Sequence, residues 1–305
     1  MTIRPRAVPR KNSRFARRAF EISRTSGLLL LPVAAILIGH AAALPAGAAE
    51  AHPPGEKEAM AILQAICPNQ IRSEILKKGM AYGCGGCPSF TGFAGQPASK
   101  GKSPDFELYK VLEGSFTKPG ASEMLAESSG CEAHVANFGG TLLLEKAGEK
   151  WRRARYNSGV VGIVRAFQRK DGRDIVLDQG GYTGQGESTG WLSTLVFSTK
   201  SDPVEHTLMR VQDTSENACQ ADRVSIGYIE NLEFPDLNGD GNPDVRVTVR
   251  WGQAKVPSEF KGNCEKEFEP PQAPAYTVDF LFDGTTFHVA PGSVATLRKV
   301  SAKDE

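Results

Sequence analysis

The sequence predicts a mainly β fold, in which antiparallel strands form a sandwich or propeller-like blades after a short, helical, cysteine-bearing N-terminal segment. Three observations support this fold class. Short runs rich in β-branched and aromatic residues recur from residue 106 onward. Turn-forming pairs such as Asp171-Gly172 and Asp283-Gly284 separate many of these runs. No long helical periodicity lies between them, which disfavours a parallel sheet with crossover helices.

The expected strands are close together along the chain, as is typical of antiparallel sheets joined by tight turns. They are Glu107–Phe116, Glu123–Ala126, Thr141–Glu145, Trp151–Tyr156, Gly159–Phe167, Asp174–Asp178, Trp191–Ser198, His206–Val211, Val224–Ile229, Val245–Trp251, Tyr276–Phe282 and Thr286–Val289.

The segment before these strands has a different pattern. Residues Glu56–Ile66 place Met60, Leu63 and Ile66 at helical spacing, which predicts an amphipathic helix. A second short helix is expected over Asn69–Lys78, because Asn69 is a helix-capping residue and Gly79 follows. Residues 90–104 are rich in Gly, Ser, Pro and Lys and are expected to form a linker. The expected divisions are therefore residues 1–48, 49–103 and 104–305.

Residues 1–48 have the order of a secretory signal peptide. A basic stretch precedes the short apolar run Leu28–Ile38, and Ala46-Gly47-Ala48 supplies a small-residue cleavage site. The apolar run contains Pro32 and is shorter than the roughly 20 residues that span a bilayer. Arg17-Arg18 leaves open whether export follows the general or the twin-arginine route. We expect a periplasmic or extracellular protein with no membrane span after signal removal.

The charge balance argues against nucleic acid as a partner. Eight of the 36 basic residues but only one of the 35 acidic residues lie before position 49, so the remaining chain carries a net charge of about −6. A nucleic-acid-binding protein needs Lys and Arg to neutralise phosphates.

All six cysteines follow the signal peptide, and an even number in an oxidising compartment predicts up to three disulfides. Proximity along the chain favours Cys67 with Cys84 or Cys87, and Cys219 with Cys264, but spacing alone does not determine the pairing. The candidate cysteines are Cys67, Cys84, Cys87, Cys131, Cys219 and Cys264.

The Cys84-Gly85-Gly86-Cys87 segment permits two further interpretations, a redox dithiol or half of a zinc site. A redox site would need a strand before it and a helix after it, and a zinc site would need a second Cys or His pair nearby. Neither accompanies this segment, so disulfide ends in a tight glycine turn are the favoured interpretation.

One segment has the pattern of a calcium loop. Asp236, Asn238, Asp240 and Asp244 occupy loop positions 1, 3, 5 and 9, and Gly241 occupies position 6. Ca²⁺ takes six to eight oxygen ligands, and glycine lets the loop reverse direction at position 6. The carbonyl of Asn242 at position 7 supplies a further oxygen. The alternative is a metal-free turn held by Asx hydrogen bonds.

The Asp-x-Asn-x-Asp-Gly-x-x-Asp pattern of this loop, followed by the strand-like Val-Arg-Val-Thr-Val, resembles the calcium loops of FG-GAP repeats, which form integrin-type propellers. The resemblance covers residues 234–249 and implies a structural calcium loop in a protein that binds partners. Elsewhere the chain looks like a secreted protein of bacterial type. An EF-hand is disfavoured because position 12 is Val247, where a bidentate Glu is required.

Residues Lys170–Asp174 look like a degenerate second copy of this loop. They keep Gly172 and the Asp174 that precedes a strand, but positions 1 and 3 are Phe167 and Arg169. Ion binding is not expected there.

An enzymatic alternative rests on Gly186-Glu187-Ser188-Thr189-Gly190, which matches the G-x-S-x-G nucleophile pattern. In this interpretation Ser188 would be the nucleophile of a secreted hydrolase, with Asp222 and either His206 or His288 as partners. A nucleophile elbow lies between a strand and a helix, whereas Ser188 lies in a glycine-rich run before another predicted strand.

The residues therefore favour an exported, non-catalytic, calcium-stabilised binding or scaffold protein with an unknown protein or glycan partner. A hydrolase that uses Ser188 is the second hypothesis, and a zinc or redox module at Cys84 and Cys87 is the third.

Overall fold

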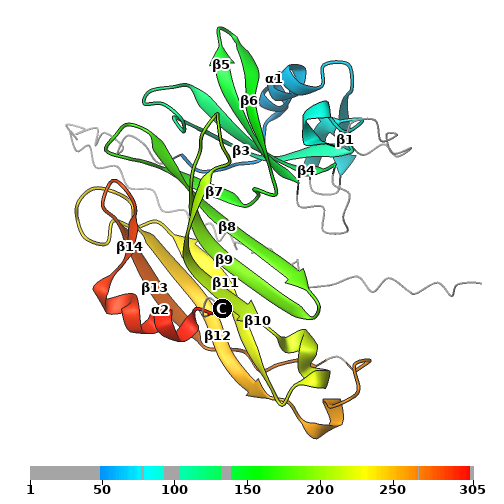
Figure 1. Ribbon diagram of the computed structural model, residues 1–305, viewed down its shortest axis with the longest axis vertical. Helices are drawn as coiled ribbons and strands as arrows, with labels where there is room; N and C mark the ends of the chain where they lie inside the picture. The colour runs from blue at the N-terminus through cyan, green and yellow to red at the C-terminus, as the bar shows by residue number, and fades with distance from the viewer. Residues whose placement is uncertain (1–48, 77–78, 93–103, 132–138, 267, 303–305) are drawn as a thin grey trace, which may run out of the picture. The chain divides into compact units, whose positions relative to one another are not determined.

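The computed structural model describes residues 49–76, 79–92, 104–131, 139–266 and 268–302. These residues form three antiparallel sheets with a helix near each end of the described chain (Figure 1). The predicted mainly β fold class is confirmed. The predicted signal peptide, residues 1–48, and most of the predicted linker, residues 93–103, lie outside the described residues.

The helices are α1 (Glu56–Ile66) and α2 (Val294–Val300). The strands are β1 (Ile71–Leu76), β2 (Gly79–Cys84), β3 (Phe106–Gly114), β4 (Glu123–Gly130), β5 (Gly140–Ala147), β6 (Lys150–Ser158), β7 (Ile163–Gln168), β8 (Asp174–Gly184), β9 (Glu187–Val196), β10 (Val204–Asp213), β11 (Arg223–Glu233), β12 (Val245–Lys255), β13 (Ala275–Phe282) and β14 (Phe287–Val289).

Each sheet follows the order of the chain. The first sheet contains β1 to β6, the second contains β7 to β10, and the third contains β11 to β14. Within each sheet, every strand pairs with the strands that precede and follow it in that sheet. Antiparallel strands can be joined by short turns, so this order needs no crossover connections. The turn signals in the sequence therefore correspond to strand-to-strand connections within the sheets.

The second sheet is covered on both faces. In β8, Ile175 and Leu177 pack with residues of the third sheet, whereas Val176 between them packs with residues of the first sheet. Successive side chains of a strand point to opposite faces. A strand buried on both faces therefore needs a continuous apolar run, which explains the Ile-Val-Leu sequence at this position.

Helix α1 covers the other face of the first sheet. Its Ala59, Ile62 and Leu63 are buried in a cluster that includes Met124 of β4. Its first turn is closed by a hydrogen bond from the Gly55 amide to the Glu58 carboxylate, at 3.3 Å. The helix has the bounds that the apolar spacing predicts.

The prediction of a second helix over Asn69–Lys78 is wrong. The chain forms the β1–β2 hairpin there, in which Leu76 pairs with Gly79 and Ile71 pairs with Cys84. An isolated helix of that length is marginal in water, whereas β2 gains backbone hydrogen bonds by pairing with β3. Gly79, expected to end a helix, has φ of +133° and begins the returning strand.

This hairpin belongs to the first sheet, so the expected division between residues 103 and 104 lies between two paired strands, β2 and β3. Two further elements differ from expectation. Helix α2 was not predicted, and β8 and β9 extend into the glycine-rich run as a long hairpin that turns at Gln185 and Gly186. Among the described residues, no helix is long and apolar enough to cross a membrane.

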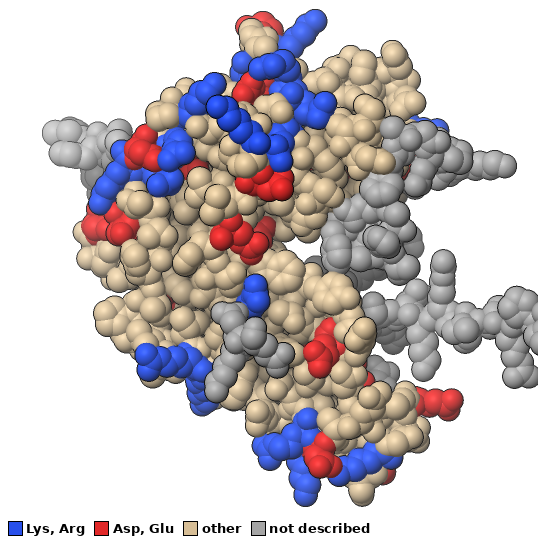
Figure 2. Space-filling view, in the orientation of Figure 1, with Lys and Arg blue, Asp and Glu red and all other residues tan. Residues whose placement is uncertain are grey.

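Acidic and basic side chains lie close together on the face shown in Figure 2. Cross-strand ion pairs among the described residues include Arg152 with Glu145 at 2.6 Å and Arg250 with Glu230 at 2.9 Å.

Candidate ion-binding loop and its surroundings

The predicted calcium loop, residues 236–244, connects β11 to β12. The expected strand after the loop is confirmed, since β12 begins at Val245. Asp236, Asn238, Asp240 and Gly241 are exposed, whereas Asp244 is fully buried. The loop therefore presents its first three predicted side-chain ligands to solvent and its last one to the protein interior.

Asp236 organises the turn of this loop. Its Oδ1 atom accepts hydrogen bonds from the amides of Gly239 at 2.8 Å and Asp240 at 3.2 Å, and its Oδ2 atom accepts one from Gly241 at 3.0 Å. Gly239 and Gly241 have φ of +76° and +83°, a region that strains other residues. The glycine at position 6 thus serves the reversal that the sequence predicts.

Asn238 and Asp240 continue the same pattern. The Asn238 Oδ1 atom accepts the Asp240 amide at 3.0 Å, and the Asp240 Oδ1 atom accepts the Asn242 amide at 2.8 Å. The Asn238 side-chain amide also donates to the Asp240 Oδ2 atom at 3.1 Å. The hydrogen bond from the Asn242 backbone lowers the pKa of Asp240 below its usual value, and the charge of Lys170 adds to this effect. Asp240 is therefore a carboxylate at neutral pH.

Asp244 has a different environment. Its Oδ2 atom accepts the Leu237 amide at 2.8 Å, and its Oδ1 atom accepts the Phe282 amide of β13 at 2.8 Å. Its own amide donates to the Pro235 carbonyl at 2.8 Å. These bonds fasten both ends of the loop to each other and to the third sheet. The ligand role predicted for Asp244 stays a prediction.

The loop offers carboxylate, amide and carbonyl oxygens, which are the ligands that a hard cation prefers. Each carboxylate has about four lone-pair sites, so the amide bonds leave Asp236 and Asp240 with capacity for an ion. Asn238 and the carbonyl of Asn242 would supply neutral oxygens. Within the described residues, however, no three side chains of His, Cys, Asp or Glu gather closely enough to hold a metal ion. A calcium site here would depend on amide and backbone oxygens as well as carboxylates.

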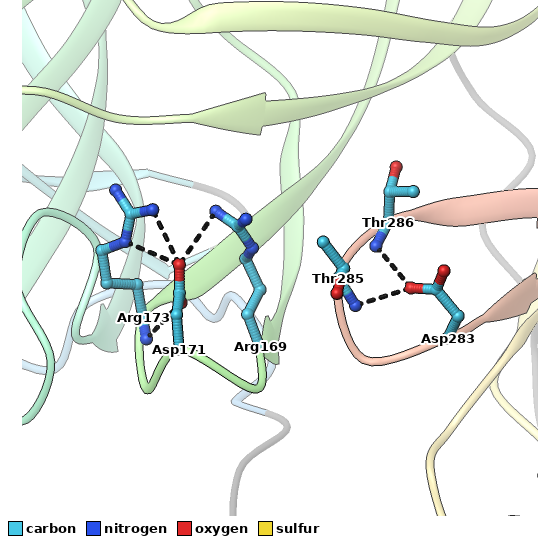
Figure 3. A network of polar contacts seen from close by, with 6 residues as sticks. All are labelled: Arg169, Asp171, Arg173, Asp283, Thr285 and Thr286. Atoms are coloured by element: carbon cyan, nitrogen blue, oxygen red, sulfur yellow. Dashed lines mark hydrogen bonds and ion pairs between the residues drawn. The ribbon is translucent and has the colours of Figure 1, made fainter.

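Two other turns lie beside this loop. The β7–β8 turn and the β13–β14 turn lie side by side (Figure 3). The Lys170 amide of the first turn donates a hydrogen bond to the Gly284 carbonyl of the second at 2.7 Å. The charge of Lys170 also acts on Asp240. The sequence did not predict that Lys170 would join the two turns and act on Asp240. The one pattern that relates these segments in the sequence is the Asp-Gly pair that both turns share with the loop.

The degenerate copy of the loop has Arg169 and Arg173 at positions 3 and 7, where the intact copy has Asn238 and Asn242. Asp171 binds the Arg173 guanidinium at 2.7 Å and lies 3.6 Å from that of Arg169 (Figure 3). The hydrogen bond from Arg173 lowers the pKa of Asp171. Asp174 is buried and accepts the Ser115 amide at 2.7 Å, and its burial raises its pKa.

The β13–β14 turn is held by Asx hydrogen bonds of the kind also considered for the candidate loop. The Asp283 Oδ1 atom accepts the amides of Thr285 at 2.7 Å and Thr286 at 2.9 Å (Figure 3). Its Oδ2 atom contacts the His288 ring at 3.0 Å. The bond from Thr286 makes the largest contribution to lowering the pKa of Asp283.

The residues of the hydrolase hypothesis have other partners. Ser188 lies within β9, and its hydroxyl forms a hydrogen bond with that of Thr183 at 2.8 Å. His288 contacts Asp283, and Asp222 forms an ion pair with Lys261. His206 lies on β10, where it pairs with Thr194 of β9. The strand-to-helix turn of a nucleophile elbow is not present at Ser188, because β9 continues to Val196.

The six cysteines form three disulfides, Cys67–Cys84, Cys87–Cys131 and Cys219–Cys264. The predicted pairing of Cys219 with Cys264 is confirmed, as is the first of the two options for Cys67. Cys84 and Cys87 belong to different disulfides, and no cysteine is free, so the zinc or dithiol hypothesis is wrong for this state of the protein. Three disulfides fit an exported or oxidising environment.

Comparison with family models, curated proteins and solved structures finds no match for this chain.

Proposed function

We propose that this chain is an exported, non-catalytic binding or scaffold protein that is stabilised by Ca²⁺ in the β11–β12 loop. The ligands would be the side chains of Asp236, Asn238 and Asp240 and the carbonyl of Asn242, with Asp244 acting directly or through a water. The partner would be a protein or a glycan held by the surfaces of the three sheets. The observation that carries the proposal is the carboxylate of Asp236, which accepts three amides of its own loop.

These hydrogen bonds support the proposal because they wind the loop tightly around the Asp236 carboxylate. The carboxylates of Asp236 and Asp240 lie four residues apart on an exposed turn, and like charges at that spacing repel each other. A divalent cation would remove this repulsion, and its oxygen preference suits carboxylate, amide and carbonyl ligands.

Ion binding in this loop would stabilise the third sheet. The loop joins β11 to β12, and Asp244 fastens it to β13 through the Phe282 amide. An extracellular calcium site has a Kd of about 10⁻⁴–10⁻³ M. At the tighter limit, about 1 mM calcium adds roughly 1.4 kcal/mol to the free energy of unfolding. For a chain of this size that corresponds to a rise in Tm of about 3–6 °C.

A thermal melt of the intact protein tests the proposal. We expect a higher Tm in millimolar calcium than in EDTA, and we expect Asp240→Ala to lose most of this difference. Asp202→Ala is the matched control, because Asp202 is an exposed aspartate that pairs with Arg155 outside the loop. Identical melting of the wild-type protein in EDTA and in calcium would overturn a structural calcium site.

A labelling experiment tests the non-catalytic part of the proposal. We expect a fluorophosphonate probe to leave Ser188 unmodified, since the hydroxyl of Ser188 bonds Thr183 and, among the described residues, no imidazole. Labelling of the wild-type protein that disappears in Ser188→Ala would instead establish the hydrolase hypothesis.

A further inference from the structure

Asp178 of β8 carries a buried carboxyl group. Its side chain lies on the face of the second sheet that packs against the first, the same face as Val176, and the residue is 4% exposed. Its Oδ2 atom accepts the Trp191 indole N–H at 3.3 Å. Its Oδ1 atom is buried and has no hydrogen-bond partner among the described residues. An ionised carboxylate in this position lacks the hydrogen bonds that water would give it.

A second buried carboxylate approaches the same place from the first sheet. Glu127 of β4 is 8% exposed, and its Oε2 atom accepts the amides of Gly162 at 2.8 Å and Ile163 at 3.1 Å. Gly162 also borders Asp178, because a Cβ atom on Gly162 would lie 3.3 Å from the Oδ1 atom of Asp178. The carboxyl groups of Asp178 and Glu127 therefore flank one glycine from two different sheets.

The charges that act on Asp178 come from three other strands, β3, β4 and β10. Glu127 of β4 and Glu205 of β10 are negative, and Glu205 is held by the Ser193 hydroxyl at 2.7 Å. Lys110 of β3 is the nearby cation, and its ammonium donates to the Ile163 carbonyl at 3.3 Å.

Arg165 of β7, although close in sequence to Ile163, has other partners. Its guanidinium lies 4.5 Å from the centre of the Phe234 ring and interacts with the charge of Glu50. Asp178 thus faces two negative groups and one positive group in a buried position.

Burial is the main cause that raises the pKa of Asp178, to about 7, and the charges of Glu205 and Glu127 add to it. The Trp191 hydrogen bond and Lys110 act in the opposite direction. The unfolded chain has an ordinary pKa of 3.8 at this position. Between pH 3.8 and about 7 the folded protein therefore holds a proton that the unfolded chain has released.

We propose that the contact between the first and second sheets is a proton-dependent junction, closed when Asp178 is protonated and loosened when it is ionised. The proton is exchanged with solvent, and the protonated Oδ1 atom becomes a donor in a site where Glu127 is the adjacent carboxylate. Stability linked to this proton is fully present in acid, falls as the pH rises from 3.8 to about 7, and is constant above that range.

Hydrogen exchange at the Gly162 and Ile163 amides tests the proposal, because these amides bond Glu127 at the junction. After correction for the intrinsic exchange rate, we expect their protection in the wild-type protein to fall by on the order of 100-fold between pH 5 and pH 8. Asp178→Asn, which cannot ionise, should lose most of this pH dependence. Asp202→Asn, at an exposed aspartate, is the control and should behave like the wild-type protein. An unchanged pH dependence in Asp178→Asn would overturn the proposal.

A second measurement needs no variant. Carboxyl ¹³C chemical shifts of the wild-type protein report the titration of each aspartate. A midpoint for Asp178 above pH 6 is expected, and a midpoint near pH 4 would overturn the proposal even if Asp178→Asn failed to fold.

Discussion

The Oδ1 atom of Asp244 accepts the backbone N–H of Phe282 at 2.8 Å and so joins two residues that lie 38 positions apart in the chain. The Oδ2 atom of the same side chain accepts the Leu237 amide at 2.8 Å. One fully buried carboxylate therefore links the start of the β11–β12 loop, the start of β12 and the end of β13. The conformation of the candidate ion loop is coupled to the third sheet through this residue.

Replacement of Asp244 should destabilise the protein strongly, even without calcium. Asp244→Ala removes the acceptor of the buried Phe282 amide and of the partly buried Leu237 amide. A buried amide without an acceptor costs about 1–3 kcal/mol and a partly buried one costs less, so we expect a decrease of about 3 kcal/mol in the free energy of unfolding. Urea denaturation in EDTA measures this decrease. Asp240→Ala, at an exposed residue of the same loop, should cost far less under the same conditions. A cost below about 1 kcal/mol for Asp244→Ala would show that the two bonds do not hold the loop.

The disulfides should contribute according to the chain length that each one closes. Cys219–Cys264 spans 45 residues and Cys67–Cys84 spans 17. Loop-closure entropy predicts that replacing both cysteines of a pair by Ser costs about 4 kcal/mol for the first and about 3 kcal/mol for the second. Urea denaturation of the paired variants checks this order. Thiol titration of the denatured protein should find no reactive thiol before reduction and six after it. Reactive thiols in the unreduced protein would contradict the three pairings.

Two glycines before β7 should differ sharply in their tolerance of alanine. Gly159 and Gly162 both have positive φ, +74° and +103°. A Cβ atom on Gly159 meets nothing within 4 Å, whereas one on Gly162 would lie 2.3 Å from the Gln179 carbonyl oxygen. We expect Gly159→Ala to cost about 1–2 kcal/mol from backbone strain alone. Gly162→Ala should cost about 3 kcal/mol or more, because the clash adds to that strain. Equal Tm values for the two variants would contradict the close packing at Gly162.

The strands from β3 onward were predictable from sequence because local signals and tertiary packing agree there. The β-branched residues of Val245–Trp251 predict a strand, and β12 begins at Val245 as expected. Helix α1 was predictable for the same reason, since its apolar spacing matches the face that it buries. The prediction for Asn69–Lys78 failed because the local pattern favours a helix, whereas pairing between β1 and β2 makes the segment a strand.

The candidate loop was predictable as a turn, but the different environments of its four side chains were not. The spacing identifies Asp236, Asn238, Asp240 and Asp244 as equivalent oxygen donors, yet burial separates Asp244 from the other three. Its partner Phe282 lies on another strand, and spacing within one segment carries no information about such a contact. The same limit applies to Asp178, whose unusual environment arises from residues on four other strands.

The most direct test of the calcium proposal is an NMR titration of the intact protein with Ca²⁺, followed at the amides of Gly239, Asp240 and Gly241. These three amides donate to Asp236, so an ion that binds the Asp236 carboxylate must change their chemical shifts. We expect saturable shifts confined to residues 236–244 and their contacts, with a Kd of about 10⁻⁴–10⁻³ M. If these amides do not respond to calcium concentrations well above that range, the loop is an Asx-bonded turn and the calcium proposal is contradicted.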